Sequence, residues 1–280
     1  MSAMGLLATP TQVLAAASTA IVGVLDRPAR IGRVVAVLPV AVHIATGDPD
    51  LPLVCVATAD AVRLPCSLVV RALPPVAVDD RVELGGGRIV VGDVEVRPSR
   101  WWQPSKPRLR DVDEARRRLK MVAPDIEDLR EWTSGRAEPG PMSTDGDLAG
   151  EPVRTVLAGG APLAELVPDL LGLGPGLTPT GDDVLAGALV ALRTAADPAA
   201  DTLAATVEAA DPATRTTTLS AALLTHATRG ECVPELAGFL DALDGRADLT
   251  NALARLRAVG GTSGTALAAG VRLALGEAAT

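Results

Sequence analysis

The stretch GLGPGLTPTGDD, residues 172–183, combines several glycines and prolines with two adjacent carboxylates. Gly174, Gly176 and Gly181 can adopt positive φ, which lets successive backbone N–H groups point into one concavity. The prolines between them restrict the loop to one shape before any ligand arrives. An apolar helical pattern follows at once, and the free N–H groups and dipole of a helix start favour an anion. The pattern therefore predicts an anion-binding loop.

The two carboxylates at the end of this loop, Asp182 and Asp183, have two interpretations. Thr180-x-x-Asp183 fits an N-cap with its acidic capping-box partner, which needs no ligand. Capping explains neither Asp182 nor the glycines before it. Both a capping role and a functional role stay open for Asp183.

The same carboxylates restrict the ligand. A bare phosphate against Asp182 and Asp183 would be repelled unless a divalent cation stood between them, so these two residues are the candidate metal ligands if a metal takes part. Alternatively, one ligand carries an anionic group for the amides and N–H donors for the aspartates, as a ureido acid or carbamoyl compound does. The sequence itself requires no cofactor.

Two more stretches place hydroxyl and glycine residues at expected helix starts: TRTTTLS at 214–220 and VGGTSGTALAAG at 259–270. Taken singly, each is explained better by helix capping. Three such starts in one helical region nevertheless predict a shared, positively polarised pocket. The expected anion-binding residues are Gly174, Gly176, Thr178, Thr180, Gly181, Thr218, Ser220, Thr262, Ser263 and Gly264, with Asp182 and Asp183 as catalytic residues.

Candidates for nucleophilic catalysis are few. His43 lies in a strand pattern and His226 in a helical one, and both are interpreted as structural histidines. Ser263 lacks the glycine of a nucleophile elbow, because Thr265 stands in its place. A serine hydrolase using Ser263 and His226 is therefore disfavoured.

Composition and charge exclude several function classes. The formal net charge of −8 disfavours nucleic acid or an anionic membrane as the partner, and aromatic residues for base stacking are scarce. Cys55, Cys66 and Cys232 are far apart and are expected to be reduced, buried thiols without zinc. No positive residue precedes Arg27, and no apolar segment is long enough to cross a membrane, so we expect a cytoplasmic protein.

The chain changes character along its length. Short β-branched runs from Ile21 to Arg97 predict strands, with a hairpin at Gly85–Gly87. A basic helix is expected from about Val112 to Met121, followed by a polar linker at Ser134–Pro152. Apolar residues spaced three and four apart then predict helices. The expected fold class is α+β: a barrel- or sandwich-like domain at 1–110, the basic helix and linker at 111–152, and an all-α domain at 153–280.

The motif regions resemble a known family. LGLGPGLTPTGDDVLAGAL (Leu171–Leu189) closely resembles the signature of the AllH-like subunit family of oxamate carbamoyltransferase, formerly a domain of unknown function. TTTLSAALLTHATRGECVPELAGFL (Thr216–Leu240) and VGGTSGTALAAGVRLAL (Val259–Leu275) are similar to its later blocks, and WWQP (101–104) to the end of its N-terminal part. The resemblance spans most of the chain in the right order.

This resemblance implies a transferase subunit in anaerobic allantoin degradation, a branch of purine catabolism and nitrogen metabolism. The assembled carbamoyltransferase converts oxalurate and phosphate to oxamate and carbamoyl phosphate, and subunits of two other types are the implied partners. The last block departs from the family pattern, which has a histidine and an aspartate where this chain has Gly261 and Ala266. This difference from the family that the chain resembles implies the loss of a substrate contact or proton-transfer group, so a non-catalytic small-anion-binding or scaffold subunit is the alternative.

Overall fold

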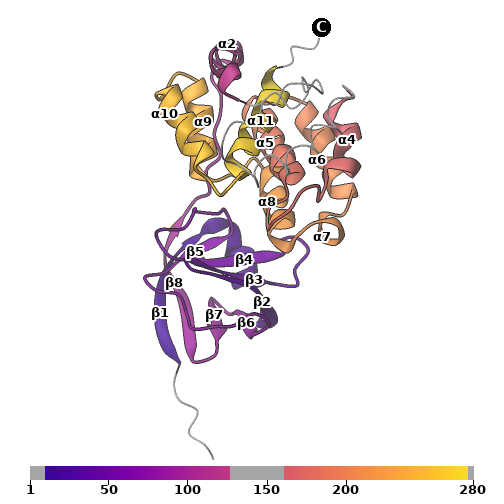
Figure 1. The fold of residues 1–280 in the computed structure, drawn as a ribbon. Helices are drawn as coiled ribbons and strands as arrows, with labels where there is room; N and C mark the ends of the chain where they lie inside the picture. Colours follow the sequence, from indigo (N-terminus) through magenta and orange to yellow (C-terminus); the bar gives the residue numbers. More distant parts are fainter. Residues whose placement is uncertain (1–9, 127–160, 277–280) are drawn as a thin grey trace, which may run out of the picture. The chain divides into compact units, whose positions relative to one another are not determined.

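The computed structural model describes residues 10–126 and 161–276 of the chain. Its contacts divide the chain into two compact units, residues 1–104 and 105–280. The first unit is a closed barrel and the second is helical, which confirms the α+β class (Figure 1).

The first unit is an eight-stranded barrel whose strands follow one another around it in the order β1-β5-β4-β3-β2-β6-β7-β8. Parallel pairing of β1 with β8 and antiparallel pairing of β1 with β5 close it. The strands are β1 (Thr11–Ser18), β2 (Arg30–Leu38), β3 (Ala41–Ala45), β4 (Leu53–Ala57), β5 (Ser67–Val69), β6 (Arg81–Gly85), β7 (Arg88–Val91) and β8 (Val94–Trp102).

Aliphatic side chains build the barrel core. Leu53, Leu68 and Ile89 are fully buried, in keeping with the near absence of aromatic residues. Register shifts between Ala15 and Ala16 in β1, and between Val34 and Ala36 in β2, mark the irregularities that help a sheet to curve and close. The hairpin expected at Gly85–Gly87 joins β6 to β7, and all three glycines have positive φ there.

The start of the barrel differs from the sequence prediction. Ile21–Leu25 was expected to be a strand, but it forms the 3-10 turn η1 (Thr19–Ile21) and the short helix α1 (Val22–Leu25). The hydroxyl of Ser18 accepts the N–H of Ala20 and so starts the turn. Strand β1, which precedes it, was not predicted, because its alanine-rich sequence has low strand propensity and its pairing with β5 and β8 is long-range.

The second unit consists of helices. Within the described residues these are α2 (Val112–Val122), the 3-10 turn η2 (Ala123–Asp125), α4 (Leu163–Leu170), α5 (Thr180–Thr194), α6 (Ala199–Ala209), α7 (Pro212–Arg215), α8 (Thr218–Thr228), α9 (Pro234–Leu243), α10 (Leu249–Arg257) and α11 (Ser263–Gly276). Helix α2 coincides with the predicted basic helix, and its N-cap Asp111 accepts the N–H of Glu114.

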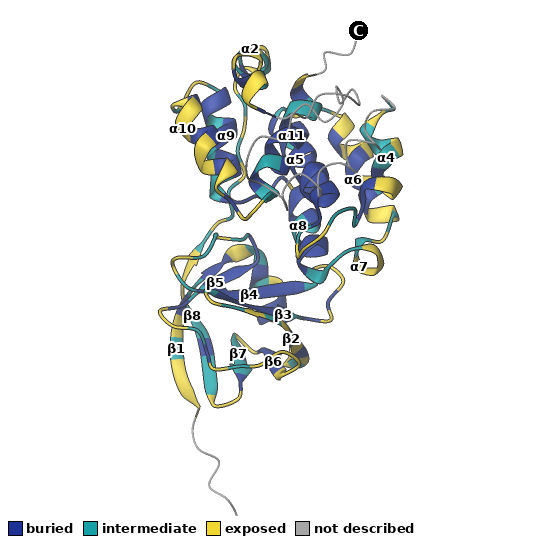
Figure 2. Ribbon diagram, in the orientation of Figure 1, coloured by how far each residue is buried: buried dark blue, intermediate teal, exposed yellow. Residues whose placement is uncertain are grey.

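Helix α5 is the centre of this unit and is buried along almost its whole length (Figure 2). It packs most extensively against α11. A Cβ on Gly187 would lie 2.2 Å from the carbonyl oxygen of Leu267, and one on Gly270 would lie 2.2 Å from that of Val184. The two glycines therefore let the backbones of α5 and α11 touch, which fixes the helix start of α5 relative to that of α11.

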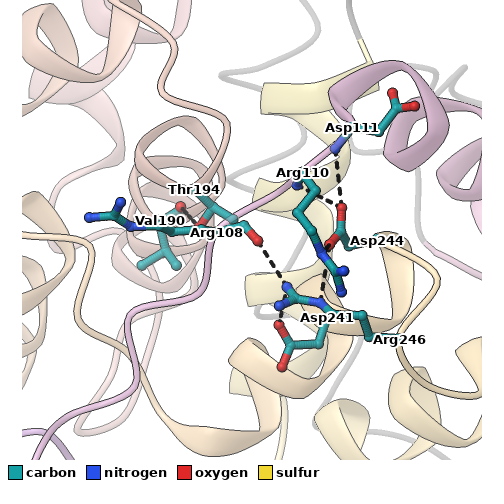
Figure 3. A network of polar contacts seen from close by, with 8 residues as sticks. All are labelled: Arg108, Arg110, Asp111, Val190, Thr194, Asp241, Asp244 and Arg246. Atoms are coloured by element: carbon teal, nitrogen blue, oxygen red, sulfur yellow. Dashed lines mark hydrogen bonds and ion pairs between the residues drawn. The ribbon is translucent and has the colours of Figure 1, made fainter.

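The segment before α2 is fastened to the carboxyl-terminal ends of three helices. Ser105 forms a β-bridge with Cys232 after α8, and the N–H of Leu109 donates to the carbonyl of Thr194 at the end of α5. Asp244, directly after α9, accepts the N–H groups of Arg110 and Asp111 (Figure 3). We call residues 105–111 the strap.

Two arginines complete the polar contacts of the strap. Arg110 Nε lies 3.1 Å from Asp244 Oδ2, and Arg246 Nε lies 3.1 Å from the same oxygen. Arg246 also donates to the carbonyl of Arg108 at 2.9 Å and pairs with Asp241 (Figure 3). The side chain of Asp244 is thus surrounded by donors although it is only 1% exposed.

Other expectations have simple outcomes. Cys55, Cys66 and Cys232 are buried and unbridged, and burial raises the pKa of each thiol. The division between the units falls at Pro104/Ser105, so α2 packs within the helical unit, while the predicted linker Ser134–Pro152 lies outside the described residues. None of the described helices has the length and apolar character needed to cross a bilayer.

Candidate functional site

The loop before α5 has an exposed tip and a buried base. Gly174 (φ 114°) and Gly176 (φ 94°) adopt positive φ as expected, whereas Gly181 is a helical residue of α5 without positive φ. A Cβ on Gly174 would lie 2.9 Å from the N atom of Thr180, so the loop folds back over the helix start. The N–H groups of Gly174 and Gly176 donate to no other residue that the structure describes. They remain candidates for an anion.

The capping-box interpretation of Thr180 and Asp183 is wrong. Helix α5 begins at Thr180, its N-cap is Pro179, and no side chain caps it. The N–H groups of Asp182 and Asp183 both reach back to the carbonyl of Pro179, at 3.0 and 3.1 Å. Because the rigid Pro179 backbone supplies this closure, the carboxyl group of Asp183 is not needed to form the helix start.

Asp182 ties three segments together. Its Oδ1 accepts the N–H of Gly172 at 2.8 Å, and its Oδ2 accepts the hydroxyl of Thr216. Burial raises the pKa of Asp182, and these two bonds, with the nearby hydroxyl of Ser220, offset part of that effect. With both oxygens occupied, Asp182 is suited to positioning the loop and the segment before α8 rather than to holding a ligand.

Asp183 has a different environment. It is 5% exposed, and its Oδ2 is buried without a hydrogen-bond partner among the described residues. Burial raises its pKa to about 7; the negative charge of Asp182 acts in the same direction, while the hydroxyls of Ser263 and Thr178 act against it. An unsatisfied buried carboxyl oxygen is rare in folded proteins and requires an explanation.

The three helix starts lie together, as the sequence predicted. Thr178 Oγ1 lies 2.8 Å from Ser263 Oγ at the start of α11. Thr217, the N-cap of α8, accepts the N–H of Ser220 and donates its hydroxyl to the carbonyl of Leu177 in the loop. The N-terminal ends of α5, α8 and α11 are thereby joined through hydroxyl groups. We call the side chains of Thr178, Asp182, Asp183, Thr216, Ser220 and Ser263 the helix-start cluster.

Two of the predicted anion-binding residues, Gly181 and Gly264, have other roles. The N–H of Gly181 donates to the carbonyl of Leu173, and that of Gly264 to the carbonyl of Val259. A Cβ on either glycine would lie about 2 Å from a carbonyl oxygen, 2.1 Å from that of Leu170 for Gly181 and 1.8 Å from that of Leu256 for Gly264. These two glycines therefore serve close packing, and their amides are already engaged and cannot bind an anion.

The remaining predicted hydroxyls form no link to the cluster. The side chains of Thr180, Thr218 and Thr262 make no hydrogen bond with another residue in the part of the chain that the structure describes, and Thr180 is buried while the other two are half-buried. Gly261 is exposed, and Ala266 is buried in the first turn of α11.

The histidines are placed away from a serine. His226 is fully buried, and its Nδ1 lies 2.6 Å from Glu231 Oε2, whose carboxyl group also pairs with Lys106. Ser263 hydrogen-bonds Thr178 and not His226, so no Ser–His pair forms in the described residues. Burial lowers the pKa of His43 in the barrel, which fits a neutral structural histidine.

The described residues do not gather a metal centre of the usual kind. Within residues 10–126 and 161–276, no group of three or more His, Cys, Asp or Glu side chains could hold a metal ion. With the oxygens of Asp182 engaged by Gly172 and Thr216, a cation at the two aspartates would depend chiefly on Asp183 and on ligands from elsewhere.

Two threonines that join the loop to the start of α8 were not singled out from the sequence. Thr216 and Thr217 make the contacts to Asp182 and Leu177, whereas the sequence favoured Thr218 and Ser220 from the same stretch. The three consecutive threonines at 216–218 indicated the region but not which threonine makes the contacts. The residue at which α8 begins determines which hydroxyl points back to the loop. The sequence signal for the N-cap was Thr217, three residues before Ser220, because an N-cap hydroxyl accepts the N–H of a residue two or three positions later.

Comparison with known proteins identifies one family for the segment that carries this site. Residues 170–275 match the model of a family described as the oxamate carbamoyltransferase subunit AllH. No curated protein and no solved structure matches the chain. The matched segment runs from the end of α4 to the end of α11 and includes the entire helix-start cluster. The resemblance seen in the sequence is thus confirmed over residues 170–275 of the helical unit, which match the AllH family.

Proposed function

We propose that this chain is a carbamoyltransferase subunit that binds a ureido acid and phosphate at the helix-start cluster. The reaction is conversion of oxalurate and phosphate to oxamate and carbamoyl phosphate, or the same transfer on a related carbamoyl compound. The observation that carries the proposal is the buried, unpartnered Oδ2 of Asp183 at the point where three helix starts meet, inside the segment matched by the AllH family. The proposed context is allantoin degradation, together with other carbamoyltransferase subunits.

The anionic end of the ligand has donors available in the loop. The N–H groups of Gly174 and Gly176 are not used by the described residues, and the start of α5 contributes the positive end of its dipole. Because the tip around Pro175 and Gly176 is exposed, an anion can approach these amides from solvent. Phosphate or the carboxylate of a ureido acid fits this end.

The carbamoyl end has an acceptor. A carbamoyl group carries N–H donors, and Asp183 Oδ2 is an acceptor without a donor. The hydroxyls of Thr178 and Ser263 flank Asp183 and supply further polar contacts to a ligand placed between the loop and α11. Such a site acts by positioning its reactants and stabilising charge in a sheltered place, not by forming a covalent intermediate.

Phosphorolysis of oxalurate by the purified chain, alone and with candidate partner subunits, tests the proposal. We expect carbamoyl phosphate formation to require phosphate and to fall roughly 100-fold or more in Asp183→Asn. Thr206→Val, which alters a half-buried threonine whose hydroxyl bonds only within its own helix, is the control that should leave turnover unchanged. Wild-type turnover in Asp183→Asn, or no carbamoyl phosphate in any combination of subunits, contradicts the proposal.

One observation favours a second function, that of a non-catalytic small-anion-binding or scaffold subunit. The helix-start cluster contains two carboxyl groups and four hydroxyls but no histidine, lysine, arginine or cysteine. In that case the chain binds phosphate or oxalurate, as a thermal shift would detect, and turnover by the complete complex is unaffected by Asp183→Asn.

A further inference from the structure

We infer that Asp183 holds the N–H end of a carbamoyl group as a carboxylate, and that a ligand entering the helix-start cluster therefore releases protons from those molecules in which Asp183 is protonated when the site is empty. This inference rests on the proposed function and deepens it, because it assigns the ends of the ligand and predicts a measurable proton exchange.

The hydroxyls around Asp183 cannot satisfy it alone. Thr178 and Ser263 each have one hydroxyl proton, and one of those protons is used in the 2.8 Å bond between them. At most one is left for the carboxyl group of Asp183. This count of hydroxyl protons agrees with the observation that Asp183 Oδ2 is buried and has no donor among the described residues.

The charges around Asp183 do not compensate for its burial. Asp182, on the same helix, is the charged group whose field reaches it, and its effect on the carboxylate is repulsive. Helix α11 presents the hydroxyl of Ser263, the loop presents that of Thr178, and α8 presents Ser220 toward Asp182. Among the described residues no lysine, arginine or histidine stabilises the ionised form of Asp183, so its pKa stands near 7, chiefly because it is buried.

The chemistry of the ligand therefore decides what happens to this proton. A ligand that donates an N–H to Oδ2 supplies the missing bond to the carboxylate, favours the ionised form and releases a proton. A phosphate or carboxylate placed against Asp183 would favour the protonated form and take up a proton. The direction of proton exchange thus distinguishes a carbamoyl N–H from an anion at this residue.

Calorimetric titration of the full-length chain measures this exchange. Oxalurate is titrated near pH 7 in two buffers with different heats of ionisation, and inorganic phosphate is titrated separately. For oxalurate we expect proton release, and an affinity that rises roughly tenfold between pH 6 and pH 8, since a group with a pKa of about 7 goes from mostly protonated to mostly ionised over that range. Phosphate exchanges protons of its own near pH 7, so its titration is compared between the unaltered chain and Asp183→Asn, and we expect no proton release that depends on Asp183.

Two variants sharpen the result. Asp183→Asn should abolish proton release and weaken oxalurate binding, whereas Asp182→Asn should retain proton release although the loop is less firmly held. The pH series on the unaltered chain keeps the test valid if Asp183→Asn does not fold.

Several outcomes overturn the inference: proton uptake with oxalurate, binding without proton exchange, no detectable oxalurate binding, or unchanged proton release in Asp183→Asn. Failure of the proposed function is distinguishable from these. If oxalurate binding releases protons but no subunit combination shows turnover, the proposed catalytic function is wrong and the inference about Asp183 stands. If turnover is observed but oxalurate binding exchanges no protons, the inference is wrong and the proposed function stands.

Discussion

Two buried carboxyl groups in the helical unit have opposite environments. Asp244, at the end of α9, accepts two backbone N–H groups and two guanidinium groups from the strap and from Arg246. Burial opposes its ionisation, but these donors outweigh burial and lower its pKa. Asp183, at the start of α5, has an unpartnered oxygen and a raised pKa.

This difference distinguishes a carboxyl group that stabilises the fold from one that is a candidate for ligand binding. The strap shows that the chain can provide a full set of donors for a buried carboxylate where it needs only stability. At the helix-start cluster it leaves one carboxyl oxygen without a donor, which costs stability unless a ligand completes the site. Asp182 resembles Asp244 in that both of its oxygens accept hydrogen bonds, although burial still raises the pKa of Asp182.

The largest expected effect concerns stability and pH at Asp183. Its pKa is raised in the folded chain from 3.8 to about 7, so the folded state binds the extra proton and stability falls as pH rises from about 4 to about 7. At about 1.4 kcal/mol per pKa unit, this loss is on the order of 4 kcal/mol. Urea unfolding of the wild type and Asp183→Asn across this range measures it; a pH-independent difference between the two would show that Asp183 is not the group responsible.

Asp244→Ala is expected to destabilise the chain by about 2 kcal/mol at neutral pH, because charge-assisted hydrogen bonds to the strap are lost. The sign with pH is opposite to that of Asp183: a lowered pKa means that the stabilisation is present at neutral pH and is lost as pH falls through the folded pKa. Denaturant unfolding at neutral and acidic pH checks both statements. An equal loss of stability in Asp244→Ala at neutral and at acidic pH would contradict them.

Thr216→Val removes the hydroxyl that donates to Asp182 and is expected to cost about 1 kcal/mol, because the buried carboxyl group loses one of its two donors. Thr206→Val, in which the hydroxyl of a half-buried threonine bonds only within α6, is the matched control and should change stability by less than about 0.5 kcal/mol. Thermal unfolding compares them, and equal shifts for the two variants would argue against a tie through Asp182.

The smallest effect on stability is expected for Ser263→Ala, because its hydroxyl bonds another hydroxyl at a half-buried position. We expect a loss below about 1 kcal/mol together with clearly weaker oxalurate binding. The contrast is measured by unfolding and calorimetry on the same sample. Unaltered binding would remove Ser263 from the site.

The sequence predicted the broad architecture because its signals are local. Alternating runs and the triple glycine gave strands and the β6–β7 hairpin, and three-to-four spacing gave the helices around α5. Strand β1 was missed since its pairing with β5 and β8 is set by residues far along the chain. Ile21–Leu25, with the composition of a strand, became helical after the Ser18 cap.

The candidate site was predicted as a region and not residue by residue. Glycines and hydroxyls at three helix starts indicated that these ends would meet, and the contacts of Thr178 with Ser263 and of Thr216 with Asp182 join them. The division between Asp182 and Asp183 could not be predicted, because it depends on which carboxyl group faces Gly172 and Thr216 from segments that are distant in sequence.

The most direct test of the account is a carbon-13 NMR titration of the Asp183 carboxyl group, assigned with Asp183→Asn, in the free chain and with oxalurate. We predict a pKa near 7 in the free chain and a clearly lower value once oxalurate donates its N–H groups. An ordinary aspartate pKa in the free chain, or a pKa that oxalurate leaves unchanged or raises, would contradict the account.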